Sequence, residues 1–256
     1  MREKIIEAVA AQERKRQVRI LFAVESGSRA WGFSSPDSDY DIRGVYVPPV
    51  EWYFKLDEKK SDTFLEMLPG DLDVACWEIG KALFQFKTCN PSFLSWLGSP
   101  IVYSDRGFLA RLRELIPDVF NPVRVACHFA AMHRKAMEDL GDDGQIRIKK
   151  LCYAMRANLC VRWVFEHESM PPTAFADVRR GVTLSSEEDS AISGLLSQKA
   201  TAAEGFRLPL PSGFGRIVEN QEFEIATRAW RNREPRLERL AELESLFKNE
   251  VLGSRT

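Results

Sequence analysis

Strand patterns are confined to the first 105 or so residues of this 256-residue chain, and nearly everything after them has the pattern of helix. Short runs rich in β-branched and aromatic residues occupy 18–27, 40–49 and 101–104, and the turn sequence Pro69-Gly70-Asp71 predicts a hairpin over 63–79. Beyond residue 105, apolar residues recur at three- and four-residue spacing. Because strands and helices are segregated along the chain, the sequence predicts an α+β fold.

The same shift in pattern predicts the domain organisation. A sheet-bearing domain is expected over 1–110 and an α-helical C-terminal domain over 111–256. No internal repeat and no low-complexity tract interrupts either part.

Charge and cysteine content limit the function classes. Lys plus Arg total 36 and Asp plus Glu total 37, so net charge gives no sign of a long nucleic-acid footprint, although a single nucleic-acid end held in a cleft remains compatible. The five cysteines form no CxxC pair and are interpreted as reduced thiols. No stretch of 18 uncharged apolar residues occurs, and we expect a soluble, cytoplasmic protein without a membrane partner.

Two acids lie one residue apart at the start of the second predicted strand, in Asp39-Tyr40-Asp41. Side chains at i and i+2 of a strand share a face, and two adjacent carboxylates are best neutralised by a hard divalent cation such as Mg²⁺ or Mn²⁺. A third acid is expected from Asp71 or Asp73, with Asp73 favoured because it lies further into its strand. The sequence leaves open one metal or two. The alternative is an ordinary turn cluster, in which the acids cap backbone N–H groups.

The preceding strand ends on Gly27-Ser28-Arg29, a turn whose backbone N–H groups, hydroxyl and guanidinium can contact phosphate oxygens. Together with the acids, this turn indicates a site for a nucleoside triphosphate and its metal, and hence phosphoryl or nucleotidyl transfer. Arg43, on the strand face of Asp41, can pair with an acid or with phosphate. Lys81, early in the helix after the third-acid strand, either reaches a phosphate or is solvated.

The ordered set of strand, Gly27-Ser28, ten-residue spacer and Asp39-x-Asp41 resembles the signature of the DNA polymerase β-like nucleotidyltransferase superfamily. Within it, GSRAWGFSSPDSDYDIRGVYV is similar to the RlaP-type group associated with RNA repair, and 73–103 and 149–172 match in order. The resemblance implies a mixed sheet with flanking helices plus a helical C-terminal domain. It further implies that Gly27 and Ser28 hold the β/γ phosphates of an NTP and that the metal is bound by Asp39, Asp41 and Asp73.

The resemblance also implies transfer of an NMP to an acceptor with release of pyrophosphate, with ATP as the expected nucleotide. Lys149, Tyr153 and Arg156 share one helix face, which either closes over the triphosphate or base or is a solvent-exposed basic face. An RNA end fits the family as acceptor, and a protein hydroxyl or a small hydroxyl compound are the alternatives. The alternative outside the enzymes is a regulatory protein that binds nucleotide without catalysing a reaction. The sequence leaves the oligomeric state open.

Overall fold

The computed structural model describes the chain except for residues 36, 57–59, 204, 220, 228–236 and 254–256, and except for the side chains of 222, 223, 227 and 237–240. The chain divides into two compact units. The first comprises Met1–Ala30, Asp39–Val119 and Glu234–Thr256, and the second comprises Trp31–Ser38 and Phe120–Arg233. The expected boundary between independent domains at residues 110 and 111 stays a prediction.

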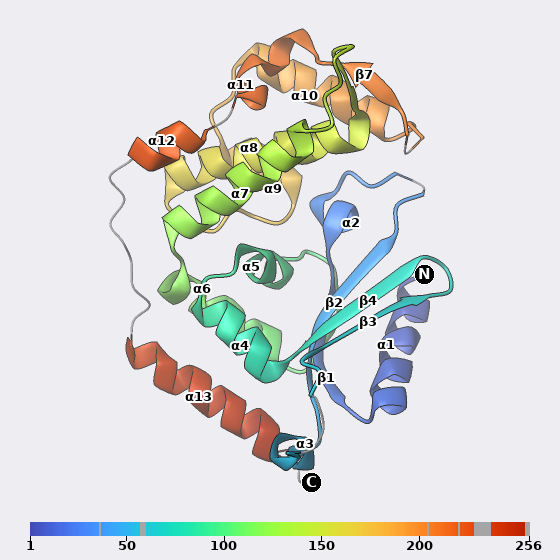
Figure 1. Ribbon diagram of the computed structural model, residues 1–256, viewed down its shortest axis with the longest axis vertical. Coiled ribbons are helices and arrows are strands. Elements are labelled where there is room, and N and C mark those ends of the chain that lie inside the picture. Colours follow the sequence, from blue (N-terminus) through green and yellow to red (C-terminus); the bar gives the residue numbers. More distant parts are fainter. Residues whose placement is uncertain (36, 57–59, 204, 220, 228–236, 254–256) are drawn as a thin grey trace. The chain divides into compact units, whose positions relative to one another are not determined.

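A five-stranded mixed sheet forms the centre of the first unit (Figure 1). Its spatial order is β3-β4-β2-β1-β5, and β2 and β4 run parallel while the other neighbours are antiparallel. The strands are β1 (Arg19–Glu25), β2 (Tyr40–Val47), β3 (Thr63–Leu68), β4 (Leu72–Glu78) and β5 (Val102–Asp105). The predicted strands, the hairpin and the α+β class are confirmed.

Helices cover both faces of this sheet. Figure 1 shows α1 on one side and α4, α5 and α6 on the other. This placement explains why β1 is buried from Ile20 to Glu25, since a central strand with helices on both sides meets no solvent. The helices of the unit are α1 (Arg2–Arg16), α2 (Gly27–Trp31, whose last residue belongs to the second unit), α3 (Val50–Phe54), α4 (Ile79–Lys87), α5 (Pro91–Leu97), α6 (Phe108–Val119) and α13 (Leu237–Leu252).

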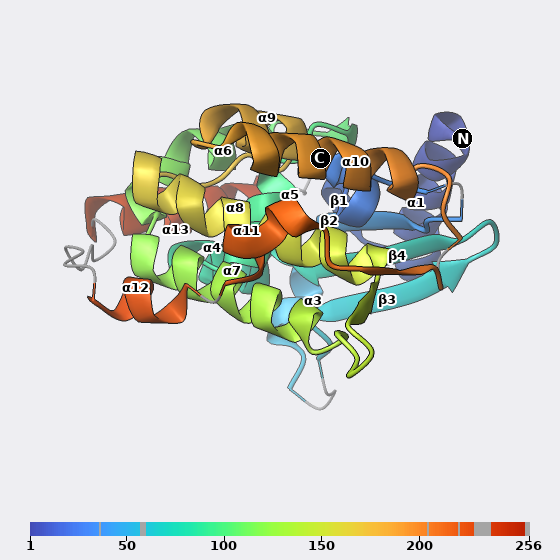
Figure 2. The ribbon, with the colours of Figure 1, turned by 90° about the horizontal axis from the view of Figure 1, so that it is seen from above.

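The second unit is mainly helical (Figure 2). Its centre is α8, whose side chains are buried on most sides. Packed against α8 are α7, α9, α10 and α11. The helices are α7 (Pro122–Met137), α8 (Ile148–His167), α9 (Phe175–Gly181), α10 (Ser186–Lys199), α11 (Gly215–Val218) and α12 (Glu222–Thr227), with a 3₁₀ turn at Ser212–Phe214. The predicted helical character is confirmed.

One feature of the second unit is absent from the sequence prediction. The strands β6 (Gln145–Arg147) and β7 (Arg207–Pro209) pair antiparallel, with Ile146 opposite Leu208. Each strand is three residues long, too short for the alternation of apolar and polar residues that marks a strand. Across the described residues, no helix is long and apolar enough to cross a bilayer.

Candidate functional site

Two of the three predicted acids lie side by side on the parallel pair β2 and β4. Asp41 and Asp73 are direct neighbours in the register of these strands. Arg43 lies between them, and its Nη2 donates to Asp41 Oδ1 at 2.9 Å and to Asp73 Oδ2 at 2.7 Å. Its Nη1 donates to the main-chain oxygen of Asp73 at 2.9 Å and of Ile42 at 3.0 Å. The side chains are partly shielded from solvent, with 17% of Arg43, 21% of Asp73 and 30% of Asp41 exposed.

The other two predicted acids, Asp39 and Asp71, lie just outside β2 and β4. Asp39 precedes β2 and is exposed, and its main-chain oxygen accepts from Arg29 Nε at 3.1 Å. Asp71 lies in the β3–β4 turn with a positive φ of 58°, so of the two candidates for the third acid it is Asp73 that adjoins Asp41. Among the described residues, no group of three or more His, Cys, Asp and Glu side chains is arranged to hold a metal ion. The convergence of Asp39 with the other two acids therefore stays a prediction.

The chemistry of the donor set fits a hard divalent cation all the same. Carboxylate oxygens are the ligands that Mg²⁺ and Mn²⁺ prefer, and Asp41 and Asp73 present theirs from adjacent strands. The proximity of two acids already requires a positive charge here, which Arg43 supplies in this structure.

Gly27 begins α2 and packs directly against the Asp41 carboxylate. A Cβ atom added at Gly27 would lie 2.1 Å from Asp41 Oδ2, and the φ of Gly27 is +58°. The main chain is tied at the same place, because Ser26 N donates to Asp41 O at 2.7 Å. Ser28 follows in α2 and is buried. The predicted phosphate turn and one predicted metal ligand are therefore in contact, and glycine is required at the contact for both space and conformation.

Glu25, the last residue of β1, is a part of this site that the sequence analysis missed. Its side chain is fully buried, and its Oε1 accepts from Asp41 N at 2.8 Å while its Oε2 accepts from the Tyr103 hydroxyl. Burial raises the pKa of the Glu25 carboxyl above its usual value. The available signal was a single acid closing an otherwise apolar strand, and its role is to hold the backbone of Asp41.

The predicted basic residues of the first unit have different placements. Arg29 stacks its guanidinium on the Tyr40 ring at 3.7 Å from the centroid, next to the start of β2. Lys81 lies beyond the other end of β4, where its Nζ bonds Asp62 Oδ1 at 2.8 Å and Thr63 Oγ1 at 2.7 Å. Five strand positions, about 16 Å at 3.3 Å per residue, separate Asp73 from the end of β4. The structure therefore does not bring Lys81 to the acids, because α4 begins only where β4 ends.

The predicted residues of α8 belong to the second unit. Tyr153 packs edge-on against Trp31 with ring centroids 5.0 Å apart, and the Arg156 guanidinium lies over Trp31 at 4.5 Å and Phe129 at 5.7 Å. Lys149, one turn before Tyr153, is half-buried. The alternative of a solvent-exposed basic face is wrong for Arg156, which is 2% exposed.

Arg156 is a buried cation of an uncommon kind. It donates to Thr173 O at 3.3 Å, its Nε has no hydrogen-bond partner, and no carboxylate pairs with it in the described part of the chain. Burial lowers the pKa of its guanidinium. An unpaired buried charge is costly, and the faces of Trp31 and Phe129 offset part of that cost by cation–π contact.

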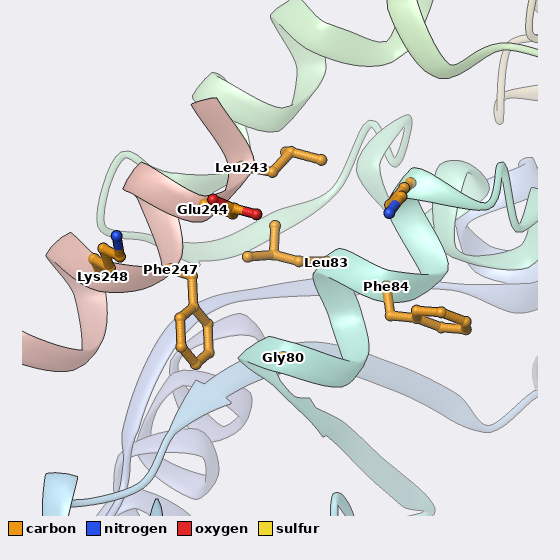
Figure 3. Close-up of a pocket in the computed structure, with 8 residues that line it drawn as sticks. Gly80, Leu83, Phe84, Leu243, Glu244, Phe247 and Lys248 are labelled. Carbon is orange, nitrogen blue, oxygen red and sulfur yellow. The ribbon is translucent and has the colours of Figure 1, made fainter. Parts of the chain in front are cut away.

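A pocket of about 270 Å³ lies elsewhere in the first unit, between α4 and α13 (Figure 3). Its walls are mostly apolar, and none of the predicted site residues contributes to it. The lining residues are Gly80, Leu83, Phe84, Lys87, Leu243, Glu244, Phe247 and Lys248.

Comparison with known proteins assigns this chain to a family. The Bacillus subtilis (strain 168) protein YcgL is 38% identical over 205 residues, which cover 80% of this chain and 78% of YcgL. A solved structure of a nucleotidyltransferase-like protein from Exiguobacterium sibiricum 255-15 aligns with 98% of this chain and 89% of its own, at 12% identity and a TM-score of 0.33, too weak a likeness to carry an argument. The family described as "RNA repair pathway DNA polymerase beta family", RlaP, matches residues 1–249. The chain therefore belongs to the RlaP family of polymerase β-type nucleotidyltransferases.

Proposed function

We propose that the protein is a metal-dependent nucleotidyltransferase that moves a nucleoside monophosphate from an NTP, with ATP expected, to a hydroxyl acceptor. In this reaction the acceptor oxygen forms a bond to the α-phosphorus, the bond from the α-phosphorus to the bridging oxygen breaks, and pyrophosphate leaves. The observation that carries the proposal is the pairing of Asp41 with Asp73 on β2 and β4, with Gly27 packed against Asp41.

The roles follow from position. Asp41 and Asp73, joined by the exposed Asp39, would hold Mg²⁺ or Mn²⁺, which when bound neutralises phosphate charge and lowers the pKa of a coordinated hydroxyl. Gly27 leaves room for the Asp41 carboxylate, and Glu25 fixes the backbone of that residue. Gly27 and Ser28 contact the β/γ phosphates, as the family motif implies.

An RNA end is the acceptor that the description of the family supports best. The nearly balanced charge of the chain favours a short contact with such an end over a long footprint on the nucleic acid. A protein hydroxyl and a small hydroxyl compound are the other acceptor classes.

The test is incubation of the purified chain with α-³²P-labelled NTPs and Mg²⁺ or Mn²⁺, supplied with total RNA, co-purifying proteins or small alcohols. We expect one acceptor class to become labelled with release of pyrophosphate. Asp41→Asn and Asp73→Asn should each lower labelling by about 10²–10³-fold, the range seen when a charge-stabilising group is removed from an active site.

Asp71→Asn is the matched control, because Asp71 is an exposed acid two residues from Asp73 and asparagine tolerates its positive φ. It should label the acceptor as well as the wild type does. Labelling that survives both Asp41→Asn and Asp73→Asn would refute the site. Nucleotide binding without any labelled acceptor would instead support a regulatory protein.

A further inference from the structure

The bonds of Arg43 suggest what this residue does at the acid pair. A single nitrogen, Nη2, bridges Asp41 Oδ1 and Asp73 Oδ2 at 2.9 and 2.7 Å. That is the position in which a shared cation neutralises two carboxylates at once. The guanidinium is held there, because Nη1 also donates to the main-chain oxygens of Ile42 and Asp73.

The backbone contributes to this placement. Arg43 is two residues after Asp41 on β2, so the two side chains leave the same face of the strand. Asp73 is opposite Asp41 across the parallel pair, so one guanidinium reaches both acids. Arg43 forms an ion pair with each of the two acids.

We propose that Arg43 is an internal counter-cation that competes with divalent metal for Asp41 and Asp73. This inference rests on the proposed function in taking these acids as metal ligands. A metal ion bound through the same oxygens would meet the guanidinium at close range, and two cations around one pair of carboxylates repel each other. Arg43 therefore stabilises the folded acid pair when no metal is bound. Metal alone binds weakly until the negative charge of a nucleotide offsets the extra cation.

The identity of the cation matters for this role. A guanidinium is planar and presents its N–H donors in fixed directions. Its fork of donors also satisfies two carboxylates and two carbonyls together, which the single ammonium of lysine cannot do in the same geometry.

The experiment measures Mn²⁺ binding to the full chain without nucleotide, by the loss of the free-ion signal in electron paramagnetic resonance. Arg43→Gln should bind Mn²⁺ at least about tenfold more tightly than the wild type, because a unit charge beside the ligands has been removed. In EDTA the same variant should have a lower Tm than the wild type, and added Mn²⁺ should restore it.

Three further variants make the result specific. Arg106→Gln removes a positive charge from a residue that bonds Glu13 and Ile20 O, away from the acids, and should leave Mn²⁺ affinity unchanged. Asp41→Asn in the Arg43→Gln background should abolish the gain. If Arg43→Gln does not fold, Arg43→Lys takes its place and should also bind Mn²⁺ more tightly than the wild type, by a smaller factor.

Unchanged or weaker Mn²⁺ binding in the Arg43 variant would overturn the proposal and make Arg43 a residue that positions the acids for metal. That failure differs from a failure of the proposed function. Labelling that depends on Asp41 with no gain in Mn²⁺ affinity refutes only the competition. A gain in affinity without any labelled acceptor refutes only the enzyme.

Discussion

Replacing Gly27 by alanine should both strain the backbone and displace the Asp41 carboxylate, and a control glycine separates the two effects. The added Cβ would lie 2.1 Å from Asp41 Oδ2, whereas ordinary contact begins at 3.4 Å, so the carboxylate must retreat by about 1.3 Å. A displacement of 1 Å at a catalytic group costs about 10²-fold in rate. A residue with a side chain at the left-handed φ of +58° also lowers the free energy of unfolding by about 1–2 kcal/mol.

We therefore expect Gly27→Ala to lose about 10²-fold in kcat/KM for nucleotidyl transfer and about 1–2 kcal/mol in the free energy of unfolding. Gly107→Ala is the matched control, because Gly107 has a φ of +90° and no atom within 4 Å of an added Cβ. The control should lose similar stability in a urea titration while keeping its turnover. Equal turnover in the two variants would refute the assignment of Gly27 to the site.

Two further predictions concern buried groups of the second unit. His133 donates from Nε2 to Ile217 O at 2.8 Å, and burial lowers its pKa below 6.5, so its contribution to stability is present above pH 6.5 and is lost as the pH falls. In urea titrations between pH 7.5 and 5.5, His133→Gln should show a shallower loss of unfolding free energy than the wild type, and equal slopes would contradict this. Arg156→Met should leave the free energy of unfolding in a urea titration unchanged or raise it by about 1 kcal/mol, because it removes a buried charge that no carboxylate neutralises among the described residues. A large fall in the free energy of unfolding would contradict this account of Arg156.

The sheet was predictable because its strands carry local signals. The central strand β1 is a continuous apolar run, and the β3–β4 hairpin has a Pro-Gly-Asp turn. The pair β6 and β7 was not predictable, since three-residue strands have no period to read and their pairing joins residues about 60 positions apart. Long-range pairing of this kind depends on the packing of the whole unit.

The candidate site was predictable in part for the same reason. The spacing of Asp39 and Asp41 and the position of Asp73 follow from strand periodicity, and the structure places Asp73 beside Asp41. Periodicity does not say which residues lie beneath the site, so Glu25 was missed. Periodicity also does not show that the length of β4 separates Lys81 from the acids, so Lys81 was considered as a phosphate contact. In the structure Lys81 bonds Asp62 instead.

Aromatic packing was the other point that the sequence could not settle. An amphipathic pattern shows which side of a helix is apolar, and Arg156 looked like part of a polar face of α8. In the structure its guanidinium is covered by Trp31 and Phe129. Arginine can be buried against aromatic rings in this way because its planar charge is weakly hydrated, a property that no hydrophobic pattern records.

The register between β2 and β4 constrains how this protein can change over evolution. Asp41 faces Asp73 only while the strands keep their alignment, and a shift of one residue would send one of the two acids to the opposite face of the sheet. Insertions and deletions should therefore accumulate in the connections that precede and follow these strands and be rare within 40–47 and 72–78. Relatives that vary widely in loop length should still keep the same number of residues between Asp41 and the end of β2, and between Asp73 and the end of β4.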